Sequence, residues 1–148
     1  MTNLIAKQAP EFNAKALTSD NKIENDFSLN QYLGKYVILF FYPMDFTFVC
    51  PTEILAFNEK LEEFKKRNAE VVAVSVDSVY THLAWKKTPV EEGGIGQINY
   101  PMVSDIKKEI GNSYGVLIDD EVALRALFLI DRDGIVRHYL INDNSIGR

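Results

Sequence analysis

A chain of 148 residues can form one domain with a hydrophobic core, and an apolar content of 47% is ordinary for a globular protein. The net charge of −5 argues against nucleic-acid binding, which needs a basic surface. No apolar run approaches the roughly 20 residues that span a bilayer, and the N-terminus lacks the apolar segment of a signal peptide. We therefore expect no nucleic-acid partner and no membrane association.

The first half of the chain predicts a strand, a helix and a second strand. Residues 1–34 read as loops with a small hairpin, and residues 36–42 form an apolar run typical of a buried strand. Apolar residues then recur every three or four positions across residues 51–67, which indicates an amphipathic helix. Residues 70–76 predict a strand parallel to the first, because strand, helix and strand follow one another as in a βαβ unit.

The second half predicts short elements separated by turns. They are a helix capped by Ser78, a glycine-rich loop over 90–97, a strand at 100–103, a helix at 105–113, and a hairpin of 124–130 with 135–141. Together the elements predict a single α/β domain with a mixed central sheet flanked by helices, in a thioredoxin-like fold.

The chain has one cysteine, Cys50, placed where the first strand hands over to the helix. One cysteine cannot form an internal disulfide, which favours a reducing compartment, and we expect the cytoplasm. A lone thiol is often inert core filling. A helix start instead stabilises a thiolate through its unpaired N–H groups and dipole, so this position favours a reactive residue.

Thioredoxin-like redox proteins carry C-x-x-C at such a junction, and here Thr47 occupies the first cysteine position. A dithiol exchange cycle within the chain is therefore excluded. The Thr47 hydroxyl can bond the thiol or a substrate, and it can equally serve as a helix N-cap.

Other candidate sites are weak in the sequence. No group of His, Cys and acidic residues has metal-ligand spacing, so we expect no metal, and His82 and His138 read as surface or packing residues. The segment GGIG lacks the Lys-Ser/Thr of a phosphate loop, so no cofactor is expected.

The segment FFYPMDFTFVCPTE, residues 40–53, contains the pattern P-x-x-x-T-x-x-C. It resembles the peroxidatic motif of the peroxiredoxins, especially the typical two-cysteine class that includes the peroxidase subunit of bacterial alkyl hydroperoxide reductase. The resemblance extends over nearly the whole chain. It includes SVDSVYTHLAW from residue 75, TPVEEGGIG from 88, YPMVSD from 100, LRALFLIDRDGIVRH from 124 and NDNSIGR from 142.

The resemblance implies a thiol peroxidase that reduces hydrogen peroxide and organic hydroperoxides in antioxidant defence. Cys50 would be the peroxidatic cysteine, whose thiolate becomes a sulfenic acid. Arg125 would be the active-site arginine that lowers the thiol pKa and holds a peroxide oxygen. Its place in the apolar run VALRALFLI supports pairing, because a buried charge is costly alone. Strand alternation also allows Arg125 to face outward.

Three further residues match the family's pocket. Pro43 would shield the thiolate, although it also serves to end the strand. Glu53 would brace Arg125, although an acidic residue in the first helical turn also suits the dipole. Arg148 matches a second arginine and is the last residue of the sequence.

Typical members continue beyond the residues that match Gly147 and Arg148, with a further helix and a tail that holds a resolving cysteine. We expect the domain to span residues 1–148 without that helix and tail. A truncated chain and a resolving thiol supplied from outside are both open. The resemblance implies a thiol reductant, such as thioredoxin or a flavin-linked disulfide reductase, and a homodimer that can build a decamer.

Two other classes of function stay open beside the peroxidase. A thiol–disulfide oxidoreductase is disfavoured by Thr47, which stands where such proteins have a cysteine. A non-catalytic assembly or chaperone role would need neither the thiolate nor Arg125.

The position of Cys50 predicts a thiol of lowered pKa. The rate of alkylation against pH should show an inflection below ~7.5, compared with about 8.5 for free cysteine. The cause is the field of the helix start together with the positive charge of Arg125. An inflection at the free-cysteine value would contradict the prediction.

Overall fold

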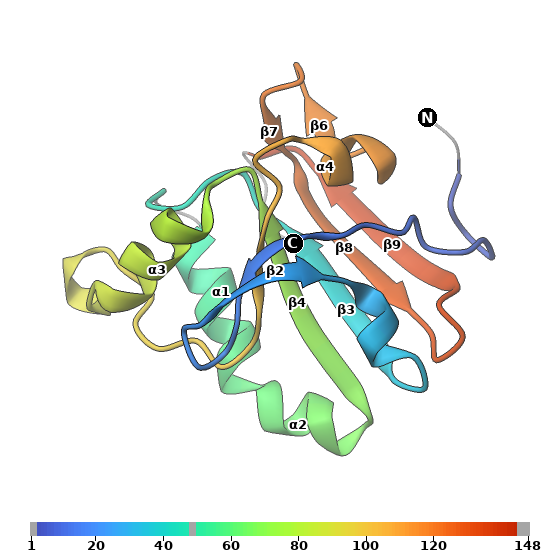
Figure 1. The fold of residues 1–148 in the computed structure, drawn as a ribbon, viewed down its shortest axis with the longest axis horizontal. Coiled ribbons are helices and arrows are strands. Elements are labelled where there is room, and N and C mark those ends of the chain that lie inside the picture. Colours follow the sequence, from blue (N-terminus) through green and yellow to red (C-terminus); the bar gives the residue numbers. More distant parts are fainter. Residues whose placement is uncertain (1–2, 48–49, 145–148) are drawn as a thin grey trace.

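The computed structural model describes residues 3–47 and 50–144, with only the backbone at Cys50. A seven-stranded mixed sheet runs through the molecule in the order β2-β1-β5-β4-β3-β8-β9 (Figure 1). Its strands are β1 (Ala14–Leu17), β2 (Ile23–Phe27), β3 (Tyr36–Phe41), β4 (Ala69–Ser75), β5 (Met102–Ser104), β8 (Arg125–Ile130) and β9 (Val136–Asn142).

The helices connect these strands along the chain. They are η1 (Leu29–Tyr32), α1 (Cys50–Glu59), α2 (Leu61–Lys66), α3 (Val79–Lys87), η2 (Val90–Glu92) and α4 (Glu109–Ser113). A two-stranded ribbon of β6 (Leu117–Ile118) and β7 (Val122–Ala123) projects at the end where α4 lies (Figure 1). The sequence did not predict this ribbon, because strands of two residues are too short to show a periodic pattern.

The central strands confirm the predicted βαβ unit. β3 and β4 are parallel and in register from Tyr36 opposite Ala69 to Phe41 opposite Val74. β3 pairs with β8 on its other side, antiparallel. The predicted C-terminal hairpin is formed by β8 and β9, and its turn is held by the Asp131 carboxylate, which accepts the N–H groups of Asp133 and Ile135.

The helix expected over residues 51–67 is two helices that meet at Lys60. Lys60 has φ −95° and ψ 5°, outside α-helical values, although its N–H still donates to Ala56 and its carbonyl accepts from Phe64. The apolar stripe therefore continues across the bend, with Ile54 and Leu61 buried. A periodic pattern survives such a bend, which is why the sequence indicated one helix.

The sheet is covered on both faces, as the apolar run in β3 predicts. On one face Phe40 packs with Ile54 of α1 and Trp85 of α3. On the other face Leu39 and Phe41 belong to a cluster completed by residues of the N-terminal segment, η1 and α4. Alternating side chains of one strand thus reach two separate cores. Among the residues described, no helix has the length and apolar character that a membrane crossing needs.

The glycine-rich loop after α3 is fastened to that helix. The indole N–H of Trp85 donates to the Gly93 carbonyl at 3.1 Å, and Gly93 adopts the left-handed φ of 89°. Gly94 is the tightest position, because a Cβ there would lie 2.0 Å from the backbone oxygen of Thr88. The loop can close against α3 only without a side chain at Gly94.

Gly94→Ala should therefore lower the free energy of unfolding by about 2 kcal/mol or more, the range of an overpacked site whose neighbour is backbone. Urea unfolding followed by tryptophan fluorescence measures the loss. Glu92→Ala, an exposed change in the same loop, is the matched control and should stay within about 0.5 kcal/mol of the unchanged chain. Equal stability of Gly94→Ala and the control would mean that the loop does not pack as described.

Candidate active site

The candidate site lies at the carboxyl ends of the parallel strands β3 and β4, where open α/β sheets place their chemistry. β3 ends at Phe41, and after the segment 42–47 the chain enters α1, which begins at Cys50. Cys50 thus occupies the first turn of α1, where backbone N–H groups lack partners within the helix. This agrees with the placement predicted for Cys50.

Arg125, the first residue of β8, is brought to the same place. Ala126 lies opposite Phe41 across the antiparallel pair, so Arg125 stands just beyond the end of β3. The residue is 3% exposed, which makes the outward-facing interpretation wrong. Its charge is paired, because Nη1 lies 2.9 Å from Oε1 of Glu53. Its Nε also donates to the Asn144 carbonyl at 2.9 Å.

Glu53 combines the two roles considered for it, a partner of Arg125 and an acidic residue at the start of a helix. It lies in the first turn of α1, three residues after Cys50, and it forms the ion pair with Arg125. One helical turn therefore separates the cysteine from the carboxylate that anchors Arg125. Removing either residue would take the ion-pair partner from a charge that is largely buried, which is costly.

The segment before α1 carries the other two matched residues. The Thr47 hydroxyl donates to the Met44 carbonyl at 2.9 Å. A hydroxyl has one proton, so in this state its oxygen is offered to other groups as an acceptor. Pro43 is half-buried and follows the end of β3 by two residues, consistent with a strand-ending role. The N-cap interpretation of Thr47 stays a prediction, and Arg148 lies outside the described residues.

The structure adds a buried polar cluster that the sequence did not predict. Asp45 and His82 are fully buried, with Oδ2 of Asp45 2.6 Å from Nδ1 of His82. The Tyr42 hydroxyl donates to Asp45 Oδ1 at 2.6 Å, and His82 Nε2 bonds the Val103 carbonyl at 3.1 Å. His82 is therefore neither a surface residue nor simple packing. The sequence does show polar residues next to the buried strands, but it does not show which of them bond to one another.

Asp77 extends this cluster toward β4. Its carboxylate accepts the backbone N–H of Asp45 at 2.8 Å and the Ser75 hydroxyl at 2.6 Å. The Ser104 hydroxyl donates to the Asp77 carbonyl at 2.6 Å. The ends of β3, β4 and β5 are thereby connected by side-chain hydrogen bonds.

The hydrogen bonds define the charge of the pair. A carbonyl only accepts, so His82 Nε2 carries a proton toward Val103 while Nδ1 faces a carboxylate. Burial alone would lower the pKa of His82, but the hydrogen bond and charge of Asp45 outweigh burial and raise it. Burial raises the pKa of Tyr42 well above its ordinary value, so its hydroxyl remains a donor. Burial also raises the pKa of Asp45, so the short contact is that of one proton held between Nδ1 of His82 and Oδ2 of Asp45.

Asp45, Asp77 and His82 offer ligand atoms within 4.8 Å of one another, so they were tested as a metal site. Their donors and acceptors already bond each other at 2.6–2.8 Å or bond neighbouring groups. A cation would have to displace these hydrogen bonds and the proton on Nδ1. The residues present fit an internal network better than a metal.

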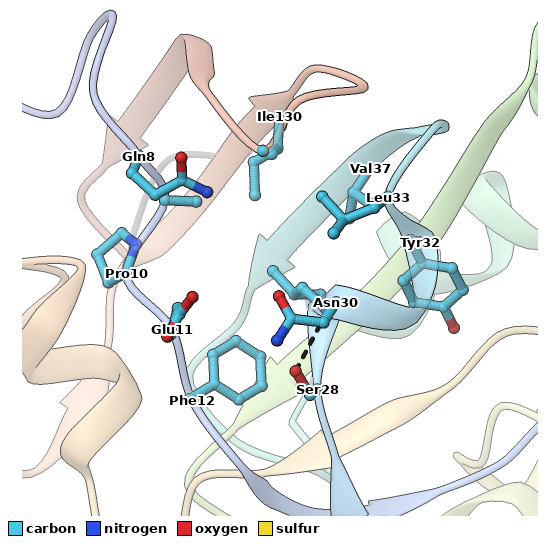
Figure 2. A pocket seen from close by; sticks show the side chains of 13 residues that line it. Gln8, Pro10, Glu11, Phe12, Ser28, Asn30, Tyr32, Leu33, Val37 and Ile130 are labelled. Atoms are coloured by element: carbon cyan, nitrogen blue, oxygen red, sulfur yellow. Dashed lines mark hydrogen bonds between the residues drawn. The ribbon is translucent and has the colours of Figure 1, made fainter.

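Two hollows lie elsewhere on the molecule. One, of about 30 Å³, is lined by Gln8, Phe12, Leu33, Val37 and Ile130 (Figure 2). Val37 lies near the start of β3, and Cys50 follows the far end of that strand, so this hollow is at the opposite end of the sheet from Cys50. Its volume suits one water. The other, of about 410 Å³, lies between the N-terminal segment and α4.

The fold and the site define a thioredoxin-like α/β domain with one cysteine at a helix start and a buried arginine tied to the same helical turn. A profile described as the AhpC/TSA family matches residues 5–139. The chain belongs to this family, as the resemblance in the motif indicated.

Known relatives agree with that assignment. Over 98% of its length the chain is 53% identical to a chloroplastic 2-Cys peroxiredoxin of Spinacia oleracea, covering 55% of that protein. It is 51% identical to alkyl hydroperoxide reductase C of Helicobacter pylori, covering 98% of the chain and 74% of the relative. The reduced 2-Cys peroxiredoxin of Plasmodium vivax superposes with a TM-score of 0.96 at 53% identity, covering 99% of this chain and 76% of that one.

The chain spans about half the length of the plant relatives it matches, 55% for the spinach protein and 54% for that of Arabidopsis thaliana. The matched region includes every element of the site described above. The thioredoxin-like fold predicted from the pattern of strands and helices is confirmed by the superposition.

Proposed function

We propose that the chain is a thiol-dependent peroxidase that reduces hydrogen peroxide and alkyl hydroperoxides through Cys50. The observation that carries the proposal is the buried ion pair of Arg125 with Glu53, which fixes a cation beside the first turn of the helix that begins at Cys50. The names of the relatives, peroxiredoxin and alkyl hydroperoxide reductase, support the same reaction.

In the proposed reaction the Cys50 thiolate attacks the terminal oxygen of the peroxide. The S–O bond forms as the O–O bond breaks, which leaves a sulfenic acid on Cys50 and a hydroxide or alkoxide. That leaving group takes a proton from solvent and departs as water or alcohol. The sulfur is oxidised and the peroxide is reduced, so electrons balance.

The residues around Cys50 contribute through charge and position. Negative charge spreads over sulfur and both oxygens in the transition state, and fixed donors at those atoms are typically the largest catalytic effect. In the proposal, Arg125 is the donor and Glu53 holds its guanidinium in place, the Thr47 hydroxyl oxygen accepts the O–H of the peroxide, and Pro43 limits access of water. Arg148 is proposed as a second cation from the resemblance alone.

Return of the sulfenic acid to the thiolate needs an electron source. We propose a thiol reductant, such as thioredoxin or a flavin-linked disulfide reductase, and a reducing compartment such as the cytoplasm. A second thiol first attacks the sulfenic acid, with loss of water, and the disulfide that results is the bond such a reductant opens.

Peroxide consumption by the purified chain tests the function. In the presence of a small thiol, the unchanged chain should consume peroxide and Cys50→Ser should not. Arg125→Ala should lose ~10²–10³ in the second-order rate, the usual effect of one donor to developing charge. Lys66→Ala, which removes an exposed cation on α2, is the control. Activity that survives Cys50→Ser would exclude the thiolate mechanism, and an unchanged rate in Arg125→Ala would place that residue outside the chemistry.

We also propose that the chain forms a homodimer through β9, which can build a decamer. β9 is an edge strand of the sheet, and Leu140 on it is 42% exposed. An edge strand of a sheet is a ready template for pairing with a second copy. Light scattering should give at least twice the mass of one chain, and Leu140→Lys should shift the mass toward the monomer. A monomer at micromolar concentration would contradict the proposal.

A further inference from the structure

The segment between β3 and α1 is held by the buried polar cluster of Asp45, His82 and Asp77. Asp45 anchors its middle, because the carboxylate bonds Tyr42 and His82 while the backbone N–H bonds Asp77. The next residue, Phe46, has the left-handed φ of 61°, a conformation that a bulky residue adopts only when its surroundings impose it. Its ring packs 5.8 Å from that of Trp85.

We propose that Asp45 and His82 are positioning residues for peroxide reduction, because their buried pair holds the segment 42–47 in the turn that delivers Thr47 to the start of α1. The proposal rests on the proposed function and adds two residues to it. Asp45 falls on an unspecified position of the P-x-x-x-T-x-x-C pattern and His82 lies outside it, and the role we assign to both is exerted through Thr47.

The contacts show why the pair acts on Thr47. Asp45 is two residues before Thr47, and the Thr47 hydroxyl bonds the carbonyl of Met44, the residue just before Asp45. Turning the Asp45 side chain out of the core would carry both neighbours with it. The orientation of the Thr47 hydroxyl is thus set by where the Asp45 carboxylate is anchored.

His82 supplies the fixed end of that anchor. It lies on α3, whose start is capped by the Ser78 hydroxyl, and its second nitrogen is bonded to Val103 of β5. The imidazole is therefore held by a helix and a strand before it meets Asp45. The groups that face the pair from the surrounding elements are Tyr42, just after β3, and Asp77, after β4.

The test compares two reactions of the same thiol. Alkylation by iodoacetamide needs the thiolate, whereas reduction of peroxide also needs oriented hydrogen-bonding groups. His82→Leu, which removes both imidazole bonds, should lower the second-order rate with hydrogen peroxide by tenfold or more while alkylation changes by less than threefold. His82→Asn, whose amide can still donate toward Asp45, should recover part of the peroxide rate.

Two further variants distinguish a positioning role from a general loss of stability. Ile110→Ala removes a buried side chain from the core on the other face of the sheet, so it measures what destabilisation alone does to the two rates. Asp45→Asn keeps the volume and an acceptor for Tyr42, and it carries the test if His82→Leu does not fold. It should also lower the peroxide rate tenfold without an equal change in alkylation.

The outcomes separate the two proposals. If the unchanged chain does not react with peroxide, the proposed function is wrong. If it does react, and His82→Leu or Asp45→Asn reacts within twofold of it, the positioning role is overturned while the function stands. Equal losses in the peroxide and alkylation rates, matched by Ile110→Ala, would likewise overturn it.

Discussion

The arrangement of the site depends on one constraint, which is that Arg125 carries its charge inside the protein. A buried guanidinium is tolerated only when it is paired and hydrogen-bonded. Here the requirement is met by Glu53 on α1 and by the Asn144 carbonyl beyond β9. Satisfying one charge therefore joins the start of β8, the first turn of α1 and the end of the described chain, and Cys50 lies in that turn.

The same rule applies a second time, to the polar residues that hold the segment 42–47. Asp45 and His82 are buried completely, and each bonds a further group besides its partner, Tyr42 in one case and Val103 in the other. Buried ion pairs add little net stability over apolar residues of the same volume. What such pairs provide here is a defined geometry, because each partner has one place where its charge is satisfied.

The sequence predicted the elements well where a period of two or of three to four residues ran long enough. The buried strand at 36–42, the parallel βαβ unit and the final hairpin are all confirmed. The bend at Lys60 was not foreseen because it does not interrupt the apolar period, and the β6–β7 ribbon was not foreseen because strands of two residues are too short to show one. For the site, the position of Cys50 at a helix start was predicted from the local change from a strand pattern to a helix pattern. The interpretation of His82 failed because its partner Asp45 is 37 positions away.

The features that were predicted depend on residues close together in the sequence, and those that were missed depend on residues far apart in it. A helix start stabilises a thiolate through groups within its own turn, so local sequence shows it. A buried charge pair is made by the fold, and only its cost is visible in the sequence, as with Arg125 inside an apolar strand. Asp45 does not interrupt an apolar run as Arg125 does, because it lies in a segment predicted to be a loop, where polar residues are expected. The burial of an acidic residue in this loop is therefore what distinguishes the turn from an ordinary surface loop, and only the three-dimensional structure shows it.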